Sequence, residues 1–447
     1  MNETNTQYSA IHFTKSNLLI LIIVAVLFST FYLTDSTTAF SIRSGDPERK
    51  ESSISSITTG STTRRISLIS LGIFWGLLLF RRRGPQFVGR RTLYWLILAY
   101  IFLAIFSVTW AVDHQLVMRR IVVLVILCVS AFSTSLNISL RQLSSVVLWT
   151  SLLVLILGIF SELSAGVFSL SFEGYRFAGT IHPNSQARNC AILFFAATVM
   201  AKSEIGMRRF LYRSVMLTAL LFLLFTKSRA TFVATIIALI ILKIHTSSRS
   251  RNVAYVYILV LLFCIGLLIL SDAFFPLLGT GLLLGREEEQ FSQLSGRLGL
   301  WTVCIDFVKA RPFVGYGFQG FWTEDRVRVI SDRLGWSPHS SHSTYMENAL
   351  NLGLIGLGVF LMMVIFAWYR ARAAYLNRRD VGMGFALTLL TLWLAVGTLD
   401  RPVGGLDIFT YLFFAVLFGI ARESSVRKNF QEAGAISART VPPSGRL

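Results

Sequence analysis

The sequence predicts an all-α membrane protein with about twelve transmembrane helices and one long, partly helical periplasmic loop. Three observations predict this fold class: 54% of the 447 residues are hydrophobic, only 15% are charged, and the mean hydropathy is +0.62. Soluble domains carry roughly a quarter charged residues, and about 20 apolar residues are enough to cross a bilayer. A soluble enzyme and a disordered chain are therefore both excluded. The predicted spans are 18–34, 66–80, 92–112, 121–136, 144–164, 186–201, 214–226, 230–245, 253–273, 347–369, 383–398 and 408–421.

The basic residues predict the orientation of these spans. The formal net charge is +19, and Lys and Arg concentrate in the cytoplasmic loops of membrane proteins. With the N-terminus placed in the cytoplasm, the inner segments hold 23 Lys and Arg and the short outer loops hold 6. The bias predicts that both termini are cytoplasmic, and it explains the basic excess without nucleic acid. The first span reads as a retained anchor or, alternatively, as a signal peptide.

The chain divides accordingly into five parts. They are a cytoplasmic N-terminus (1–17), transmembrane helices 1 to 9 (18–273), a periplasmic loop (274–346), transmembrane helices 10 to 12 (347–421) and a disordered cytoplasmic tail (422–447). Loops longer than about 15 residues are usually either functional or disordered. The periplasmic loop contains aromatic residues, charges of both signs and a helix-like stretch, so we expect it to fold and to carry catalytic residues.

Ionisable side chains gather at one depth of the predicted bundle. The middles of the spans carry almost none, although charges within a membrane usually mark function. An ion-coupled transporter would place carboxylates near the midplane. The predicted site therefore handles a substrate at the outer leaflet. The ionisable residues at the outer ends are Arg176, His182, Arg188, Lys227, Arg229, Glu347, Asp400 and Arg401.

Two outer segments offer cations to an anionic substrate. Arg176 lies shortly before His182, where a His-Pro-Asn sequence predicts a helix start capped by Asn184 or by the serine after it. A helix N-terminus attracts anions. Lys227 and Arg229 occupy a very short turn between two apolar runs. The alternatives are that Arg176 only reaches toward the interface and that lipid headgroups neutralise the turn.

Within the long loop, Arg297 opens a stretch whose apolar residues recur at helical spacing over 300–308. We expect an amphipathic helix on the membrane surface there. Arg311 and Pro312 are expected to end it, and the glycines of 315–318 predict a turn. Arg297, at the start of the helix, is the residue of this stretch that we expect to be functional.

Two histidines precede the tenth predicted span. His339 and His342 lie three residues apart, and a histidine exchanges a proton near neutral pH, as a general base must. The alternatives are a helix cap and a metal site, but no third ligand accompanies them at the usual spacing. Asp46 and Glu48 form an acidic pair among serines and threonines, which is typical of a solvated turn.

Segments 176–184, 228–229, 296–301, 311–318 and 339–356, in this order, resemble the O-antigen ligase and polysaccharide polymerase superfamily, including exopolysaccharide polymerases of rhizobia. The resemblance implies a metal-independent, inverting glycosyltransferase without a cofactor in the bacterial inner membrane. Such an enzyme moves a glycan from undecaprenyl pyrophosphate to a sugar hydroxyl at the periplasmic face. The implied acceptor is lipid A core in ligases and a growing glycan in polymerases. A chain-length regulator and a flippase are further implied partners.

The resemblance also implies roles for individual residues. Arg176 and Arg297 would hold the pyrophosphate, with Lys227 and Arg229 beside them. His342 would act in acid–base catalysis, although a changed spacing and Ser343 in place of the usual Asn leave His339 as the alternative. Secondary candidates are His182, Arg188, Arg311, Glu347 and Arg401.

Three functions remain open from the sequence. The segment 176–184 favours a polymerase over a ligase that joins the glycan to lipid A core. A transporter or flippase for lipid-linked oligosaccharide would need polar span middles, and these are nearly bare. A non-catalytic assembly subunit would bind the lipid-linked glycan without transferring it.

Overall fold

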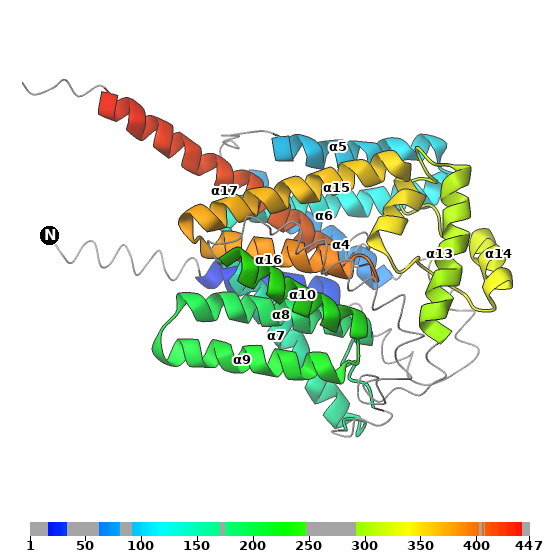
Figure 1. The fold of residues 1–447 in the computed structure, drawn as a ribbon, viewed down its shortest axis with the longest axis horizontal. Coiled ribbons are helices and arrows are strands. Elements are labelled where there is room, and N and C mark those ends of the chain that lie inside the picture. Colours follow the sequence, from blue (N-terminus) through cyan, green and yellow to red (C-terminus); the bar gives the residue numbers. More distant parts are fainter. Residues whose placement is uncertain are drawn as a thin grey trace, which may run out of the picture.

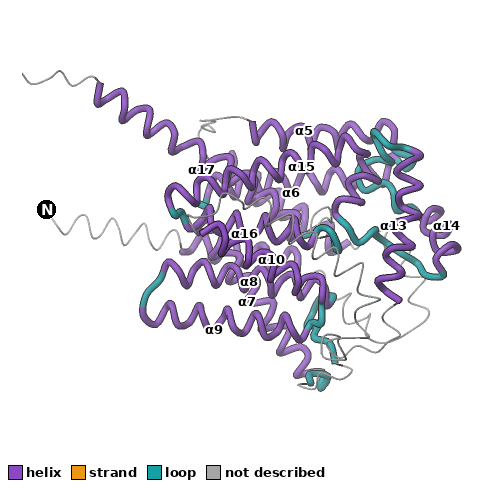
Figure 2. Tube along the Cα trace, viewed as in Figure 1, coloured by secondary structure: helices purple, strands orange, loops and turns teal. Residues whose placement is uncertain are grey.

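The computed structural model describes residues 17–33, 62–80, 92–169, 175–246, 292–401, 405 and 407–439, and within them every regular element is helical (Figure 2). Helices and closed barrels are the structures that satisfy their own backbone groups in lipid. A helix over 17–28 runs into the π-turn η1 (Ser29–Leu33). The other helices are α4 (Thr62–Phe80), α5 (Thr92–Phe106), the 3₁₀ turn η2 (Ser107–Trp110), α6 (His114–Asn137), α7 (Leu140–Ser164), α8 (Pro183–Ser203), α9 (Gly206–Phe225), α10 (Arg229–Thr246), α13 (Ser292–Ala310), α14 (Glu324–Leu334), α15 (Thr344–Arg378), α16 (Val381–Val396) and α17 (Ile408–Arg439).

The long helices form a bundle, with α13 across one end and α14 outside it (Figure 1). Helix α16 lies at the centre, where it contacts α7, α8, α10 and α15, and almost all of its side chains are buried. Peripheral helices leave large apolar side chains exposed, for example Trp95, Phe102 and Phe210. Apolar side chains on the outside of a helical bundle are suited to contact with lipid tails, which are as apolar as leucine.

Each predicted span within the described residues coincides with a helix, whereas span 253–273 lies outside them. The number of twelve is not confirmed. Among the described residues, five helices are long and apolar enough to cross a membrane, namely Thr62–Phe80, Thr92–Trp110, His114–Asn137, Leu140–Ser164 and Thr344–Arg378. Shorter apolar helices occupy Asn17–Tyr32, Arg229–Ile241 and Val381–Val396. Helices α8 and α9 are not in either group, because each carries several polar or basic residues in its first turns. Their apolar parts are correspondingly shorter.

Two segments differ from the sequence prediction in a simple way. Helix α17 continues to Arg439, so it extends over most of the tail 422–447 for which the sequence predicts disorder. The N-cap of α8 is His182, whose side chain accepts a hydrogen bond from the Asn184 backbone N–H at 3.2 Å. The sequence favours Asn184 or Ser185 as this cap, but the proline after His182 fits the first helical turn and shifts the start forward.

The described part of the long loop is folded, as predicted. Helix α13 ends at Ala310 and turns follow over 311–319, which confirms the predicted stop and turn. Leu300, Cys304, Phe321, Ile330 and others form a second buried cluster that joins α13, α14 and the start of α15. The end of the bundle that carries α13 is therefore a packed layer, not an open loop.

Helix α15 is broken at Gly353, whose φ is 67° and ψ is −169°. The chain over 312–317 docks at the break through its backbone. Leu354 N–H donates to the Pro312 carbonyl at 2.7 Å, and the N–H groups of Tyr316 and Gly317 donate to carbonyls of the turn before the break, both at 2.9 Å. The first part of α15 is thereby fixed to the loop that leads into α14.

We expect Gly353→Ala to destabilise the protein by more than about 2 kcal/mol, because this backbone conformation is nearly exclusive to glycine. An added Cβ would also collide with the backbone of Phe313 and Val314. The midpoint of thermal unfolding in detergent measures the effect. Gly358→Ala is the matched control on the same helix, since a Cβ at Gly358 meets nothing within 4 Å. Equal midpoints for the two variants would contradict the expectation.

Candidate active site

The segment with the two histidines forms a short loop that leads into α15. Ser343 is the N-cap of α15 and accepts a hydrogen bond from the Met346 N–H at 3.4 Å, so neither histidine caps this helix. His342 has a positive φ of 52°, which is uncommon for a residue other than glycine. Such a conformation persists where its surroundings impose it.

Three hydrogen bonds impose it here. Trp301 of α13 donates its indole N–H to the Ser341 carbonyl at 2.8 Å. The Ser341 N–H donates to the Glu347 carboxylate at 2.7 Å. On the other side of His342, the Thr344 N–H donates to the Gly397 carbonyl at 2.8 Å. The loop is thus held by α13, by α15 and by the segment that follows α16.

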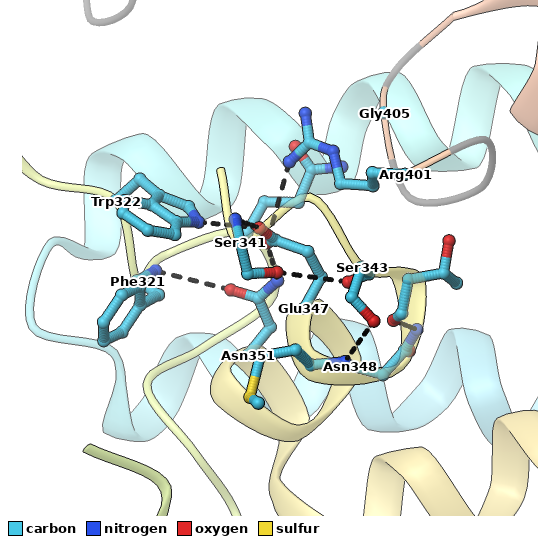
Figure 3. Close-up of polar contacts among 12 residues, drawn as sticks. Phe321, Trp322, Ser341, Ser343, Glu347, Asn348, Asn351, Arg401 and Gly405 are labelled. Atoms are coloured by element: carbon cyan, nitrogen blue, oxygen red, sulfur yellow. Dashed lines mark hydrogen bonds and ion pairs between the residues drawn. The ribbon is translucent and has the colours of Figure 1, made fainter. Parts of the chain in front are cut away.

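Glu347 is the centre of a buried polar cluster in the first turn of α15 (Figure 3). Its carboxylate accepts hydrogen bonds from the Trp322 indole at 2.9 Å and the Asn351 amide at 3.3 Å, in addition to the Ser341 N–H. Arg401 lies 3.6 Å from the same carboxylate. Glu347 is only 3% exposed, and these donors offset the cost of burying its carboxylate. It joins the histidine loop to the segments before α14 and after α16.

A second buried ion pair lies beside it. Arg188 of α8 pairs with Asp400, donates to Ser185 at 3.0 Å and stacks on the Phe409 ring at 4.8 Å. Burial alone would raise the pKa of the Asp400 carboxyl, but Arg188, the Arg401 N–H and other nearby cations together hold it below its usual value. Asp400 therefore stays ionised at neutral pH and ties α8 to the segment after α16.

His342 lies among these charges. Burial lowers the pKa of its imidazole first and Arg297 lowers it further, while Asp400 and Glu347 act in the opposite direction. The net result is a pKa below the ordinary 6.5. Arg297 lies in the first part of α13, and its guanidinium interacts electrostatically with Asp400 and Arg229. The imidazole is therefore neutral at pH 7 and lies in the same electrostatic cluster as a guanidinium.

The segment that precedes α8 also contributes residues to this cluster. Arg176 donates to the Thr226 carbonyl at 2.8 Å and to the Asn184 side chain at 2.6 Å. The loop itself is held by Glu162 at the end of α7, which accepts the Gly179 N–H at 2.7 Å and also pairs with a tyrosine hydroxyl. The side chain of His182, which caps α8, interacts electrostatically with Arg176, Arg188, Asp400 and His342.

Residues 214–361 match the family model described as O-antigen ligase. They run from α9 to the middle of α15 and include Arg229, Arg297, His342 and Glu347. This part of the chain is similar to the O-antigen ligase family.

A curated protein is also similar to part of this chain. Over 99 residues the chain is 32% identical to "Exopolysaccharide production protein ExoQ" of Rhizobium meliloti (strain 1021). The alignment covers 20% of this chain and 22% of that protein. The chain thus matches less than a quarter of the relative's length. The predicted resemblance to the O-antigen ligase and polymerase superfamily is confirmed, and the long apolar helices are those of a membrane protein.

Most of the predicted site residues meet in one region, at the end of the bundle that carries α13. The exceptions are informative. His339 is exposed, and no charged group in the described part of the chain acts on it. Arg311 is exposed and stacks on Tyr316 at 5.0 Å, away from the ion pairs. Lys227 lies in the turn between α9 and α10 with a buried side chain. The residues that come together are Arg176, His182, Arg188, Arg229, Arg297, His342, Glu347, Asp400 and Arg401.

Three residues gain a role that the sequence did not assign. Glu162 holds the Arg176 loop, Asp400 pairs with Arg188, and Arg120 at the start of α6 donates to the Gln319 carbonyl. Arg401 and Glu347 are among the charges that act on Arg120. All three are ionisable residues at the ends of predicted apolar runs, so the signal that identified the other candidates also applies to them.

A metal site does not emerge from the described residues. Within those ranges, no group of three or more His, Cys, Asp and Glu side chains is placed to hold an ion. The acidic pair Asp46 and Glu48 lies outside the described residues.

Proposed function

We propose that this chain is a membrane glycosyltransferase that moves a glycan from undecaprenyl pyrophosphate to a sugar hydroxyl at the periplasmic face. The observation that carries the proposal is the shared cluster of His342 and Arg297, inside the part that matches the O-antigen ligase family. A neutral imidazole can accept a proton, and a guanidinium can bind a pyrophosphate through two parallel hydrogen bonds. These are the two groups that the transfer requires.

In the proposed reaction the acceptor hydroxyl attacks the anomeric carbon of the glycan. Its proton passes to His342 as the new carbon–oxygen bond forms. The bond from the anomeric carbon to the pyrophosphate breaks, and its electron pair leaves with the carrier. Arg297 and Arg176 stabilise the negative charge that collects on the pyrophosphate, without a metal ion. Attack from the side opposite the leaving group inverts the anomeric configuration.

The two ion pairs hold this arrangement. Asp400 and Arg188 join α8 to the segment after α16, and Glu347 with Arg401 holds the histidine loop. These residues act through the position of His342 and through the local charge, not by contact with the reacting atoms. Positioning of this kind is a large part of enzymatic rate enhancement.

Polymerisation of exopolysaccharide or O-antigen repeat units is the reaction we favour, because the relative is an exopolysaccharide production protein. Ligation to lipid A core is the second candidate, because the matched family model is described as O-antigen ligase. Purified protein incubated with undecaprenyl-pyrophosphate oligosaccharide distinguishes them. A ladder of chain lengths supports polymerisation, and a single transfer to lipid A core supports ligation.

The same assay tests the wider proposal. Activity should survive a chelator, and Arg297→Ala should abolish it while membrane insertion is retained. Binding of the lipid-linked oligosaccharide without any transfer would indicate an assembly subunit. Movement of the oligosaccharide across a vesicle membrane without a new glycosidic bond would indicate a flippase. Either outcome would overturn the proposal.

The pH dependence of transfer follows from the lowered pKa of His342. The base must be unprotonated, so kcat/KM should fall as the pH drops through the pKa of His342, and the midpoint of this acid limb should lie below pH 6.5. Arg401 is one of the cations that lower this pKa, so Arg401→Gln should move the acid limb to higher pH. A limb at or above pH 6.5 in the unaltered protein would contradict His342 as the base.

A further inference from the structure

A cleft of about 390 Å³ opens between α8 and α9. It lies toward the ends of the helices where α8 connects to α9, opposite to the end that carries α13 and α14 (Figure 1). The cleft is therefore remote from the candidate active site. Its lining residues are Thr198, Ala201 and Lys202 of α8 and Arg209, Arg213 and Met216 of α9.

Three of the six lining residues are cations. Arg209 donates to the Glu204 carbonyl at 2.6 Å, which fixes its guanidinium at the wall. The carboxylate of Glu204 instead pairs with Arg141 and Arg208, both at 3.9 Å, and neither of these lines the cleft. Within the described residues, Lys202 and Arg213 have no carboxylate partner. The cleft thus carries a net positive charge that the described part of the protein does not neutralise.

The other lining residues are small or apolar, and α9 presents an apolar surface beside them. Phe210 is 64% exposed, Leu217 60% and Leu221 49%. In an integral membrane protein, large exposed apolar side chains on a helix suit lipid tails. The cleft therefore combines cations near the helix ends with an apolar border along the helix.

We propose that this cleft binds the headgroup of an anionic phospholipid, phosphatidylglycerol, from the leaflet opposite to the candidate active site. Lys202, Arg209 and Arg213 bind the headgroup phosphate by charge-assisted hydrogen bonds, and an acyl chain lies along Met216 and Leu217. Basic pockets between transmembrane helices are suited to anionic headgroups. The inference requires only that the chain lies in a membrane, so it is independent of the glycan transfer reaction.

Native mass spectrometry of the purified full-length protein tests the proposal with phosphatidylglycerol and with phosphatidylcholine of the same acyl chains. Each cation near a membrane surface changes affinity by about fivefold. Lys202→Gln with Arg213→Gln should therefore weaken phosphatidylglycerol binding by about thirtyfold, and Arg213→Gln alone by about fivefold. The charge-conserving pair Lys202→Arg with Arg213→Lys should retain binding.

A matched control removes two cations from the same end of the bundle but not from the cleft. Arg208 and Arg378 suit this purpose, and Arg208→Gln with Arg378→Gln should bind phosphatidylglycerol like the unaltered protein. Equal binding of the two phospholipids, or unchanged binding by the Lys202 and Arg213 variants, would overturn the proposal. Displacement of the lipid by millimolar inorganic phosphate would reassign the cleft to a free anion and would overturn it as well.

Discussion

Replacing His342 by alanine is expected to lower the rate of glycan transfer by about 10²–10⁴-fold, the usual contribution of a positioned general base. The imidazole is the neutral proton acceptor of the cluster, within electrostatic range of Arg297, Asp400 and Glu347. The loss should appear in kcat, because the substitution does not remove a cation that binds the pyrophosphate. Transfer from undecaprenyl-pyrophosphate oligosaccharide, measured at saturating donor, gives the number.

His339→Ala is the matched control for this substitution. His339 lies three residues away in the same loop, but its side chain is exposed and it belongs to no ion pair or hydrogen bond of the described cluster. Its removal should leave the transfer rate within about twofold. A loss in His339→Ala with full activity in His342→Ala would exchange the two roles and would contradict the assignment made from the geometry.

Replacing Glu347 by alanine is expected to cost about 3 kcal/mol of stability or more and to abolish transfer. The change leaves the Trp322 indole and the Ser341 N–H without their acceptor and Arg401 without its partner. Removal of one member of a buried ion pair typically costs about 3–5 kcal/mol, and each unsatisfied donor adds to the loss. Because Ser341 precedes His342 directly, the imidazole should also lose its position.

Glu347→Gln separates the two effects. The amide oxygen can still accept the hydrogen bond of Ser341, so the thermal midpoint should recover in part, whereas the attraction to Arg401 is lost. The matched control is Glu324→Gln on α14, whose carboxylate is exposed and pairs only weakly with Arg328 at 4.0 Å. If Glu347→Ala melted like Glu324→Gln, the central role of Glu347 in the cluster would be wrong.

The positions of the helices could be predicted from the sequence because the apolar runs that form them are long. The number of true spans could not be, because α8 and α9 combine an apolar stretch with polar ends that a simple count of runs overlooks. The break in α15 also has no sequence signal. Gly353 and Gly358 occur in the same apolar run, and only the docked loop distinguishes them.

The sequence predicts which ionisable residues belong to the site, but it does not predict which of them form ion pairs with each other. The sequence placed Arg188, Glu347, Asp400 and Arg401 at one depth, and the structure pairs them as Arg188 with Asp400 and Glu347 with Arg401. These partners are far apart along the chain, so only the packing of α8, α15 and the segment after α16 determines which acid meets which base. The same applies to His342, whose spacing from His339 gave no reason to prefer either.

The docking of the 312–317 segment on α15 is made by main-chain atoms. Side chains there, such as the exposed Phe313 and Val314, contribute nothing to those hydrogen bonds. Substitutions of these exposed side chains should therefore leave the docking intact, so that the surface over 312–317 can change while the first turns of α15, which bear Glu347, stay in place.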